Sequence, residues 1–185
     1  FERLVVIYDE NPSLQDRVVR RGIVRKKTAA DLGLVGFVAR ASGIPSDRRV
    51  RFPFPPYDEL MVREATRSNG DVNDRVWVRI EEVRESIRLI REILARLPGG
   101  PALPSGSLQV RPQPGRTGLG IVEGWRGEIV TWVQAGPSGE VHRVMVRDPS
   151  QVNWLGLERA VLGNIVPDFP LCNKSFNQSY SGHDL

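Results

Sequence analysis

The sequence contains almost no cysteine, and this limits the chemistry that the chain can carry. Cys172 is the single cysteine among 185 residues. A disulfide within the chain is therefore excluded, and so is a zinc or iron–sulfur site built from several cysteines of this chain alone. A lone thiol fits a reducing compartment.

Long apolar runs are missing as well. The longest of them fall far short of the ~20 residues that a membrane-spanning helix needs, and no basic stretch followed by an apolar one marks a signal peptide. We therefore expect neither a transmembrane segment nor a signal peptide. Because the chain begins with Phe1, we expect a fragment of a larger protein.

The common catalytic signatures are also absent. There is no phosphate-binding glycine loop ahead of a lysine, no Rossmann fingerprint and no nucleophile elbow. His142 and His183 are the only histidines, and His142 lies in a predicted strand, where we expect a structural role. His183 precedes Asp184, a carboxylate that could hold its tautomer and raise its pKa.

The charge is basic but dispersed. The formal net charge is +4 and the pI about 9.7, with far more arginine than lysine. The arginines alternate with glutamates along one predicted helix, and no basic stripe studded with aromatic residues occurs, which argues against nucleic acid. The excess favours a solvated, ion-paired face or a surface that docks onto acidic partner subunits.

Helix signals dominate the first hundred residues. A short helix is predicted from the N-cap Asn11 to the stop at Gly22. A second is predicted from the N-cap Thr28 to Gly43. The proline-rich segment 44–60 predicts an extended loop that packs against the body through three aromatic residues, namely Phe52, Phe54 and Tyr57.

Two glycines of the second predicted helix, Gly33 and Gly36, lie three residues apart. Glycine has no Cβ, so this spacing allows another helix or backbone segment to come close.

The strongest periodic signal spans residues 71–97, where apolar residues recur at steps of three and four. These residues are Val72, Val76, Ile80, Val83, Ile87, Ile90, Leu94 and Leu97. They predict one helix about 40 Å long at ~1.5 Å per residue, stopped by the sequence PGGP at 98–101. Its wide apolar stripe favours the buried central helix of a bundle, with a coiled coil as the alternative.

Apolar and polar residues then alternate in two runs joined by Ala135–Gly139, which predicts a β-hairpin. Leu119–Trp125 is predicted to add a third strand, and Asn153–Leu162 a short helix. The expected fold class is α+β and helix-dominant. The expected parts are a helical-bundle part at 1–101 with the long helix at about 71–97, a Pro/Gly-rich connection at 102–118, and antiparallel β plus a short helix and a site-like tail at 119–185.

The chain closes with LCNKSFNQSYSGHDL, in which small polar residues follow an apolar run. Ser179 and Gly182 lie at the spacing with which two cysteines clamp one metal, yet neither is a cysteine. On the residues alone, the tail can be a working site, a disordered end, or a metal site that has lost its ligands.

Two stretches carry a resemblance to a known family. The run GDVNDRVWVRIEEVRESIRLIREILARLPGGP, preceded by LGLVGFVARASGIPSDRR, resembles the large subunit shared by respiratory complex I and the [NiFe] hydrogenases. VEGWRGEIVTWV, followed by HRVMVRDPSQVNWLGLERAVLGNIVPDFPL, resembles the closing part of that family. Asn153 and Trp154 resemble the formate-hydrogenlyase and hydrogenase-4 branch. The resemblance covers nearly the whole chain and implies that the family's amino-terminal half, with its first nickel-binding cysteines, precedes Phe1.

On this resemblance the tail corresponds to the metal loop that ends the hydrogenase subunits. That loop begins with a serine, here Ser175, and reads Asp-Pro-Cys-x-x-Cys. Asn177 and Gln178 replace Asp-Pro, and Ser179 and Gly182 replace the cysteines. Nickel and iron need thiolates here, whereas a hydroxyl is a poor ligand and glycine has no side chain. The resemblance therefore implies no Ni–Fe centre, no metal or cofactor bound by this chain, and no [NiFe]-hydrogenase activity of its own.

The resemblance to complex I instead implies a quinone pocket beside an iron–sulfur cluster of a neighbouring subunit. Ser179, His183 and Asp184 would supply its hydrogen bonds and protons. Arg126 matches the arginine that lies over the metal centre in hydrogenases and is the fourth candidate, with a structural role as the alternative. Leu185 departs from the arginine that commonly closes this loop.

Two hypotheses follow. In the first, the chain is part of a complex I-like or hydrogenase-4-like membrane-bound oxidoreductase that serves quinone-linked electron transfer. Its partners would be a small iron–sulfur subunit and membrane subunits, and it would lie in the cytoplasm on the inner face of the cell membrane. The electron donor can be NADH, formate or ferredoxin. In the second, the chain is a non-catalytic scaffold that holds the iron–sulfur subunit through its arginine-rich helix face.

Overall fold

The structure, a computed structural model, describes residues 1–100 and 112–185. Most of the predicted connection at 102–118 lies outside the described residues, and the division into parts at 1–101 and 119–185 stays a prediction. In chain order the elements are α1 (Glu2–Asp9), α2 (Pro12–Val18), α3 (Lys26–Asp31), α4 (Gly36–Ala41), α5 (Arg48–Arg51), α6 (Val72–Arg96), β1 (Thr117–Gly124), β2 (Gly127–Ala135), β3 (Val141–Arg147), α7 (Pro149–Ala160), a 3-10 turn η1 (Val166–Asp168), α8 (Phe169–Phe176) and α9 (Tyr180–His183).

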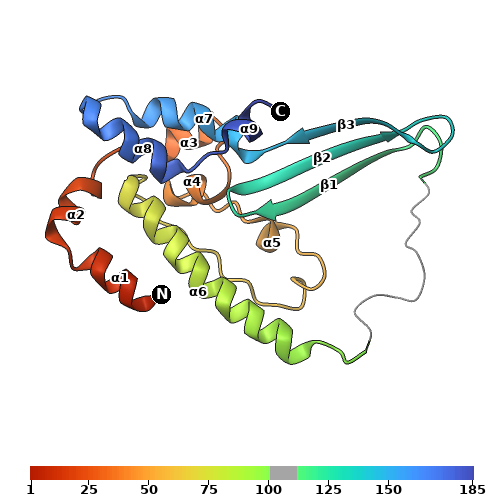
Figure 1. Ribbon diagram of the computed structural model, residues 1–185, viewed down its shortest axis with the longest axis horizontal. Coiled ribbons are helices and arrows are strands. Elements are labelled where there is room, and N and C mark those ends of the chain that lie inside the picture. Colours follow the sequence, from red (N-terminus) through yellow and green to blue (C-terminus); the bar gives the residue numbers. More distant parts are fainter. Residues whose placement is uncertain (101–111) are drawn as a thin grey trace.

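Helices and one small antiparallel sheet make up this architecture (Figure 1). The sheet has the strand order β1-β2-β3, and its predicted hairpin and third strand are both present. The predicted helix-dominant α+β class is therefore confirmed. Within the described ranges, every helix is too short or too polar to cross a bilayer.

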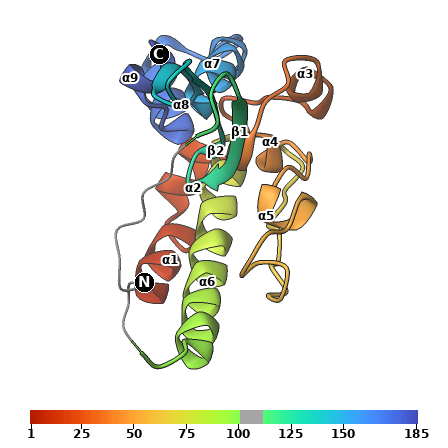
Figure 2. The ribbon, with the colours of Figure 1, turned by 90° about the vertical axis from the view of Figure 1, so that its right-hand side faces the viewer.

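The long helix α6 forms as its periodicity predicts. The Asp71 side chain accepts a hydrogen bond from the Asp74 amide and caps its first turn. The first half of α6 lies in the molecule, but the second half extends past α4 with α1 alongside (Figures 1 and 2). Ile90 is 55% exposed and Leu94 63%. The periodic stripe thus predicts the helix correctly, but the described residues bury only its first half.

The predicted single helix from Thr28 to Gly43 is wrong. Two short helices, α3 and α4, replace it, because Gly33 and Gly36 adopt φ angles of +64° and +65°. This left-handed conformation interrupts an α-helix and suits glycine. The expected close approach is found at Gly36 alone, since nothing lies within 4 Å of a Cβ built on Gly33.

The segment after α4 also differs from its prediction. Instead of a loop pinned by aromatic side chains, it contains the short helix α5, capped by the Asp47 carboxylate. Phe52 is 67% exposed and Phe54 37%. The aromatic residues therefore do not anchor this segment in the described structure.

One hydrophobic core joins the helices from both ends of the chain. Its members are Val24, Ala29, Leu34, Phe37, Val38, Ala39, Ala41, Val78, Leu157, Ala160, Cys172 and Phe176. Asn153 of α7 locks these helices together, since its side chain accepts from the Val35 amide at 3.0 Å and donates to the Val35 carbonyl at 3.1 Å. The tail that follows α8 is held on this base.

Candidate functional site

Arg126 occupies the tight turn between β1 and β2, beside α4 (Figure 1). The backbone there crosses the start of α4 so closely that a Cβ on Gly127 would lie 2.8 Å from the Gly36 Cα. The partly buried Arg126 donates from Nε to the carbonyl oxygen of Asn177 at 2.6 Å, and its guanidinium lies over the Trp125 ring. The fold thus places Arg126 against the tail.

Asn177 turns the chain from α8 into the tail. It ends α8 with φ +48° and ψ +44°, a left-handed conformation that asparagine tolerates better than most residues. Its neighbour Gln178 is buried and donates from Nε2 to the Phe176 carbonyl. The carbonyl that receives Arg126 is therefore fixed at a folded turn.

Ser179 begins the short helix α9. Its Oγ accepts from the Gly182 amide at 3.0 Å and lies 3.1 Å from the Ser181 Oγ, while its own amide donates to the Ser150 Oγ at 2.9 Å. Positions 179 and 182 therefore lie side by side across one turn. Two cysteines at this spacing would need the same arrangement to share one metal.

The space beside Gly182 is already filled. A Cβ on this buried glycine would lie 2.6 Å from the Asp148 Cγ and 2.8 and 2.9 Å from its two carboxylate oxygens. Asp148 is held in place because its Oδ1 accepts from the Ser150 amide at 2.7 Å and caps α7. A carboxylate thus occupies the volume that a second cysteine would need.

These residues do not fit a nickel–iron centre. At the two ligand positions the chain offers a hydroxyl that already caps a helix and a residue without a side chain, and Asp148 blocks the second position. In residues 1–100 and 112–185, no cluster of three or more histidine, cysteine, aspartate or glutamate side chains could hold a metal.

Gly182→Ala should destabilise the protein by about 1–2 kcal/mol, because the new methyl group displaces Asp148 from its capping position. Urea unfolding followed by circular dichroism measures this. Gly118→Ala is the matched control, since nothing lies within 4 Å of a Cβ at that strand position. Asp148→Ser keeps a capping oxygen on a shorter side chain and should relieve most of the loss. An equal loss with and without Asp148→Ser would contradict the steric explanation.

His183 and Asp184 lie at the other end of the tail turn. The exposed His183 ring stacks on Trp154 of α7, with ring centroids 4.8 Å apart and planes inclined by 20°. Asp184 ends α9 and is exposed, and the Gln151 amide group donates to the Leu185 carbonyl at 2.8 Å. In the described structure these contacts tie both candidates to α7, whereas Arg126 contacts the start of the tail.

Arg75 anchors α6 to the tail, a role that the sequence did not reveal. This fully buried side chain donates to the Ser175 Oγ at 2.9 Å and to the carbonyl oxygens of Gly70 and Gly22 at 2.8 Å. Burial lowers the pKa of Arg75 to about 10. Its position three residues after the buried Val72 was the available signal, since residues three apart share a helix face.

A buried ion cluster fixes the approach to Arg126 from the other side. Arg40 is 1% exposed and pairs with Glu82 at 2.6 Å and with Glu123, on β1, at 3.0 Å. Burial lowers the pKa of Arg40, but the surrounding carboxylates outweigh this and raise it. Burial also raises the pKa of Glu82 and Glu123. Because Glu123 lies three residues before Arg126, this cluster positions the β1–β2 turn.

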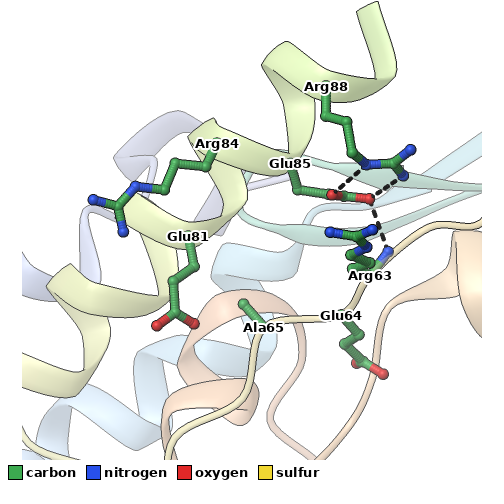
Figure 3. A pocket seen from close by; sticks show the side chains of 7 residues that line it. All are labelled: Arg63, Glu64, Ala65, Glu81, Arg84, Glu85 and Arg88. Carbon is green, nitrogen blue, oxygen red and sulfur yellow. Dashed lines mark hydrogen bonds and ion pairs between the residues drawn. The ribbon is translucent and has the colours of Figure 1, made fainter. Parts of the chain in front are cut away.

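A separate pocket of 320 Å³ lies between α6 and the segment around Ala65 (Figure 3). Its charged lining residues are Arg63, Glu64, Glu81, Arg84, Glu85 and Arg88. Arg88 pairs with Glu85 inside the pocket. Three cations face three carboxylates there, so the pocket has no excess charge that would attract an ionic ligand.

The sequence matches the family described as "Respiratory-chain NADH dehydrogenase, 49 Kd subunit" over residues 1–184, and the chain belongs to this family. This confirms the family resemblance read from the sequence.

Individual relatives come from both branches of that resemblance. The chain is 32% identical to the carbon monoxide-induced hydrogenase of Rhodospirillum rubrum, covering 97% of this chain and 49% of that protein. It is 33% identical to formate hydrogenlyase subunit 5 of Escherichia coli, covering 99% and 32%. It is 37% identical to an NADH-quinone oxidoreductase subunit of Roseiflexus sp., covering 91% and 46%. The chain thus spans half or less of the length of these curated relatives.

Proposed function

We propose that this chain is part of a complex I-like or hydrogenase-4-like oxidoreductase subunit that serves quinone-linked electron transfer without a metal centre of its own. Its membership of the 49-kDa subunit family and its relatives named as NADH-quinone oxidoreductase and formate hydrogenlyase subunits support this. The observation that carries the proposal is the tail turn, which keeps two ligand positions side by side while Ser179, Gly182 and Asp148 fill them without a thiolate.

In this proposal the tail turn and Arg126 form one wall of a quinone pocket. The Arg126 guanidinium spends Nε on Asn177 and has further N–H groups for a carbonyl oxygen. The Ser179 hydroxyl accepts from Gly182 and can still donate one hydrogen bond. His183 and Asp184 would exchange protons with solvent, since both are exposed. Electrons would come from an iron–sulfur cluster of a partner small subunit, and membrane subunits would hold the assembly on the cytoplasmic face.

The test is a titration of the intact complex with a quinone analogue. Arg126→Gln and Ser179→Ala should each weaken its affinity about tenfold or more, because each removes a hydrogen-bond donor from a desolvated contact. His183→Ala should lower turnover with little change in affinity. Ser179→Thr, which retains a hydroxyl, and Ser138→Ala, on the exposed β2–β3 turn, serve as controls and should behave like the wild type.

The second candidate is a scaffold whose tail only holds a partner subunit. It is favoured by the structural use of the tail side chains: Ser179 caps α9, and His183 stacks on Trp154. Unchanged affinity and turnover in Arg126→Gln, Ser179→Ala and His183→Ala would overturn the quinone proposal and leave the scaffold.

A further inference from the structure

A groove of 780 Å³ runs along α3, α4 and α5, on the opposite side of α6 from α1 (Figure 2). Its floor is apolar, and its lining includes Ala30, Leu34 and Ile44. The surface above Gly33 is open, since nothing lies within 4 Å of a Cβ built there. This volume falls in the range of ~300–1,000 Å³ typical of ligand pockets.

The groove lies in the most basic part of the chain. Residues 17–51 hold ten arginine and lysine residues and only two aspartates. The whole chain has a formal net charge of +4, so the remaining residues are net acidic. The positive charge is therefore concentrated around this groove instead of being spread over the surface.

Among the described residues, two of the cations that line the groove have no carboxylate partner. Arg48 is paired with Glu128. Lys26 is exposed, and Arg51 uses its guanidinium on the Pro45 carbonyl at 3.0 Å. Neither lies within ion-pair distance of an acidic side chain in residues 1–100 and 112–185. The charge-balanced pocket of Figure 3 shows the contrast.

We propose that this groove binds an acidic segment of a partner protein, with its carboxylates on Lys26 and Arg51 and an apolar side chain on the floor. Complementary charge steers such a segment to the groove, and the apolar floor retains it. A planar guanidinium such as that of Arg51 matches the two oxygens of a carboxylate. The inference rests on the proposed assembly into a complex but not on quinone chemistry.

A polypeptide fits the groove better than a lipid surface does. The apolar residues form the floor of a recess between the cations, whereas membrane-surface binding needs apolar side chains that project from the protein. Within the described lining, Phe52 is the one strongly exposed apolar side chain.

The test is photo-crosslinking in the complex purified through a tag on this chain. Ala30→p-benzoylphenylalanine places the probe in the groove, and Ser138→p-benzoylphenylalanine places it on the distant β2–β3 turn. We expect the groove probe to crosslink to one segment, rich in aspartate and glutamate, of another subunit. Lys26→Glu and Arg51→Glu should each reduce the yield about tenfold. Lys27→Glu makes the same charge change next to the groove, where Lys27 already pairs with Asp31, and should leave the yield nearly unchanged.

The other occupants give different products. A phospholipid adduct, a crosslink within the same polypeptide, or a partner segment without excess acidic residues would each overturn the proposal, and so would equal losses in Lys26→Glu and Lys27→Glu. Turnover with the quinone analogue is measured on the same preparations. Its loss in Arg126→Gln alone separates the quinone site from this docking groove.

Discussion

Gly36→Ala is expected to destabilise the protein by about 3–5 kcal/mol, whereas Gly33→Ala should cost about 1–2 kcal/mol. The two glycines are only three residues apart and have nearly the same left-handed φ, +65° and +64°. The strain of placing a Cβ on that backbone is therefore common to both variants.

The surroundings of the two positions differ. A Cβ on Gly36 would overlap the Arg126 carbonyl oxygen and the Gly127 Cα, and it would lie 2.7 Å from the Arg126 carbonyl carbon. Backbone atoms cannot rotate away as a side chain can, so α4 and the β1–β2 turn must separate. That movement disrupts the packing of the buried Phe37 and shifts Arg126 away from Asn177.

Urea unfolding of the two variants and the wild type, measured by circular dichroism, gives the difference directly. Gly33→Ala carries the conformational strain alone and serves as the matched control. Similar losses for both variants would show that the crossing at Gly36 is not close-packed. An intact fold with equal stability would remove the basis for placing Arg126 beside the tail.

These two glycines also show how far the sequence predicts the fold. Their spacing correctly indicated a close backbone approach, but it did not indicate which of them makes it or that both would interrupt a helix. That outcome depends on the β1–β2 turn, which lies about 90 residues further along the chain. Periodicity, in contrast, is local, and it was sufficient to predict α6 and the hairpin.

The candidate site divides in the same way. The family resemblance pointed to Arg126 and the tail, and the fold brings Arg126 to Asn177, next to Ser179. The resemblance could not reveal that Asp148 fills the space at Gly182. That relation joins positions far apart in the chain, each of which reads locally as an ordinary turn or cap residue.

Buried arginines were the main features that the sequence concealed. A single arginine on a helix suggests a solvated side chain, and most are solvated. Arg40 and Arg75 are 1% and 0% exposed. Only the three-dimensional fold shows which acceptors surround each of them, and therefore which one has a large electrostatic effect on stability.

Arg40→Met is expected to reduce stability by about 3–5 kcal/mol at pH 7, because it leaves Glu82 and Glu123 without their shared cation. Arg40 donates to Glu82 at 2.8 Å from Nε and to Glu123 at 3.0 Å. Methionine fills much of the same volume, so the loss reports the unpaired carboxylates more than a cavity. Arg84→Met is the control, since Arg84 pairs with Glu2 at the surface and should change stability little.

The pH dependence of this loss separates an electrostatic cause from a packing cause. Burial already raises the pKa of Glu82 and Glu123 in the folded protein above the ordinary value near 4.5. A carboxyl whose pKa is raised on folding contributes stability below its unfolded pKa and loses it as the pH rises through the folded pKa. Removing Arg40 raises both folded pKa values further. The deficit of Arg40→Met relative to the wild type should therefore be small near pH 4 and grow as the pH rises toward 7.

Urea unfolding at several pH values measures this deficit, and adding Glu82→Gln and Glu123→Gln to Arg40→Met tests its source. Neutral amides carry no charge to strand, so the triple variant should recover much of the loss at pH 7 and lose the pH dependence. A deficit that is the same at pH 4 and pH 7 would assign it to packing. In that case the cluster beside the β1–β2 turn would position Arg126 through shape, and its ion pairs would contribute little.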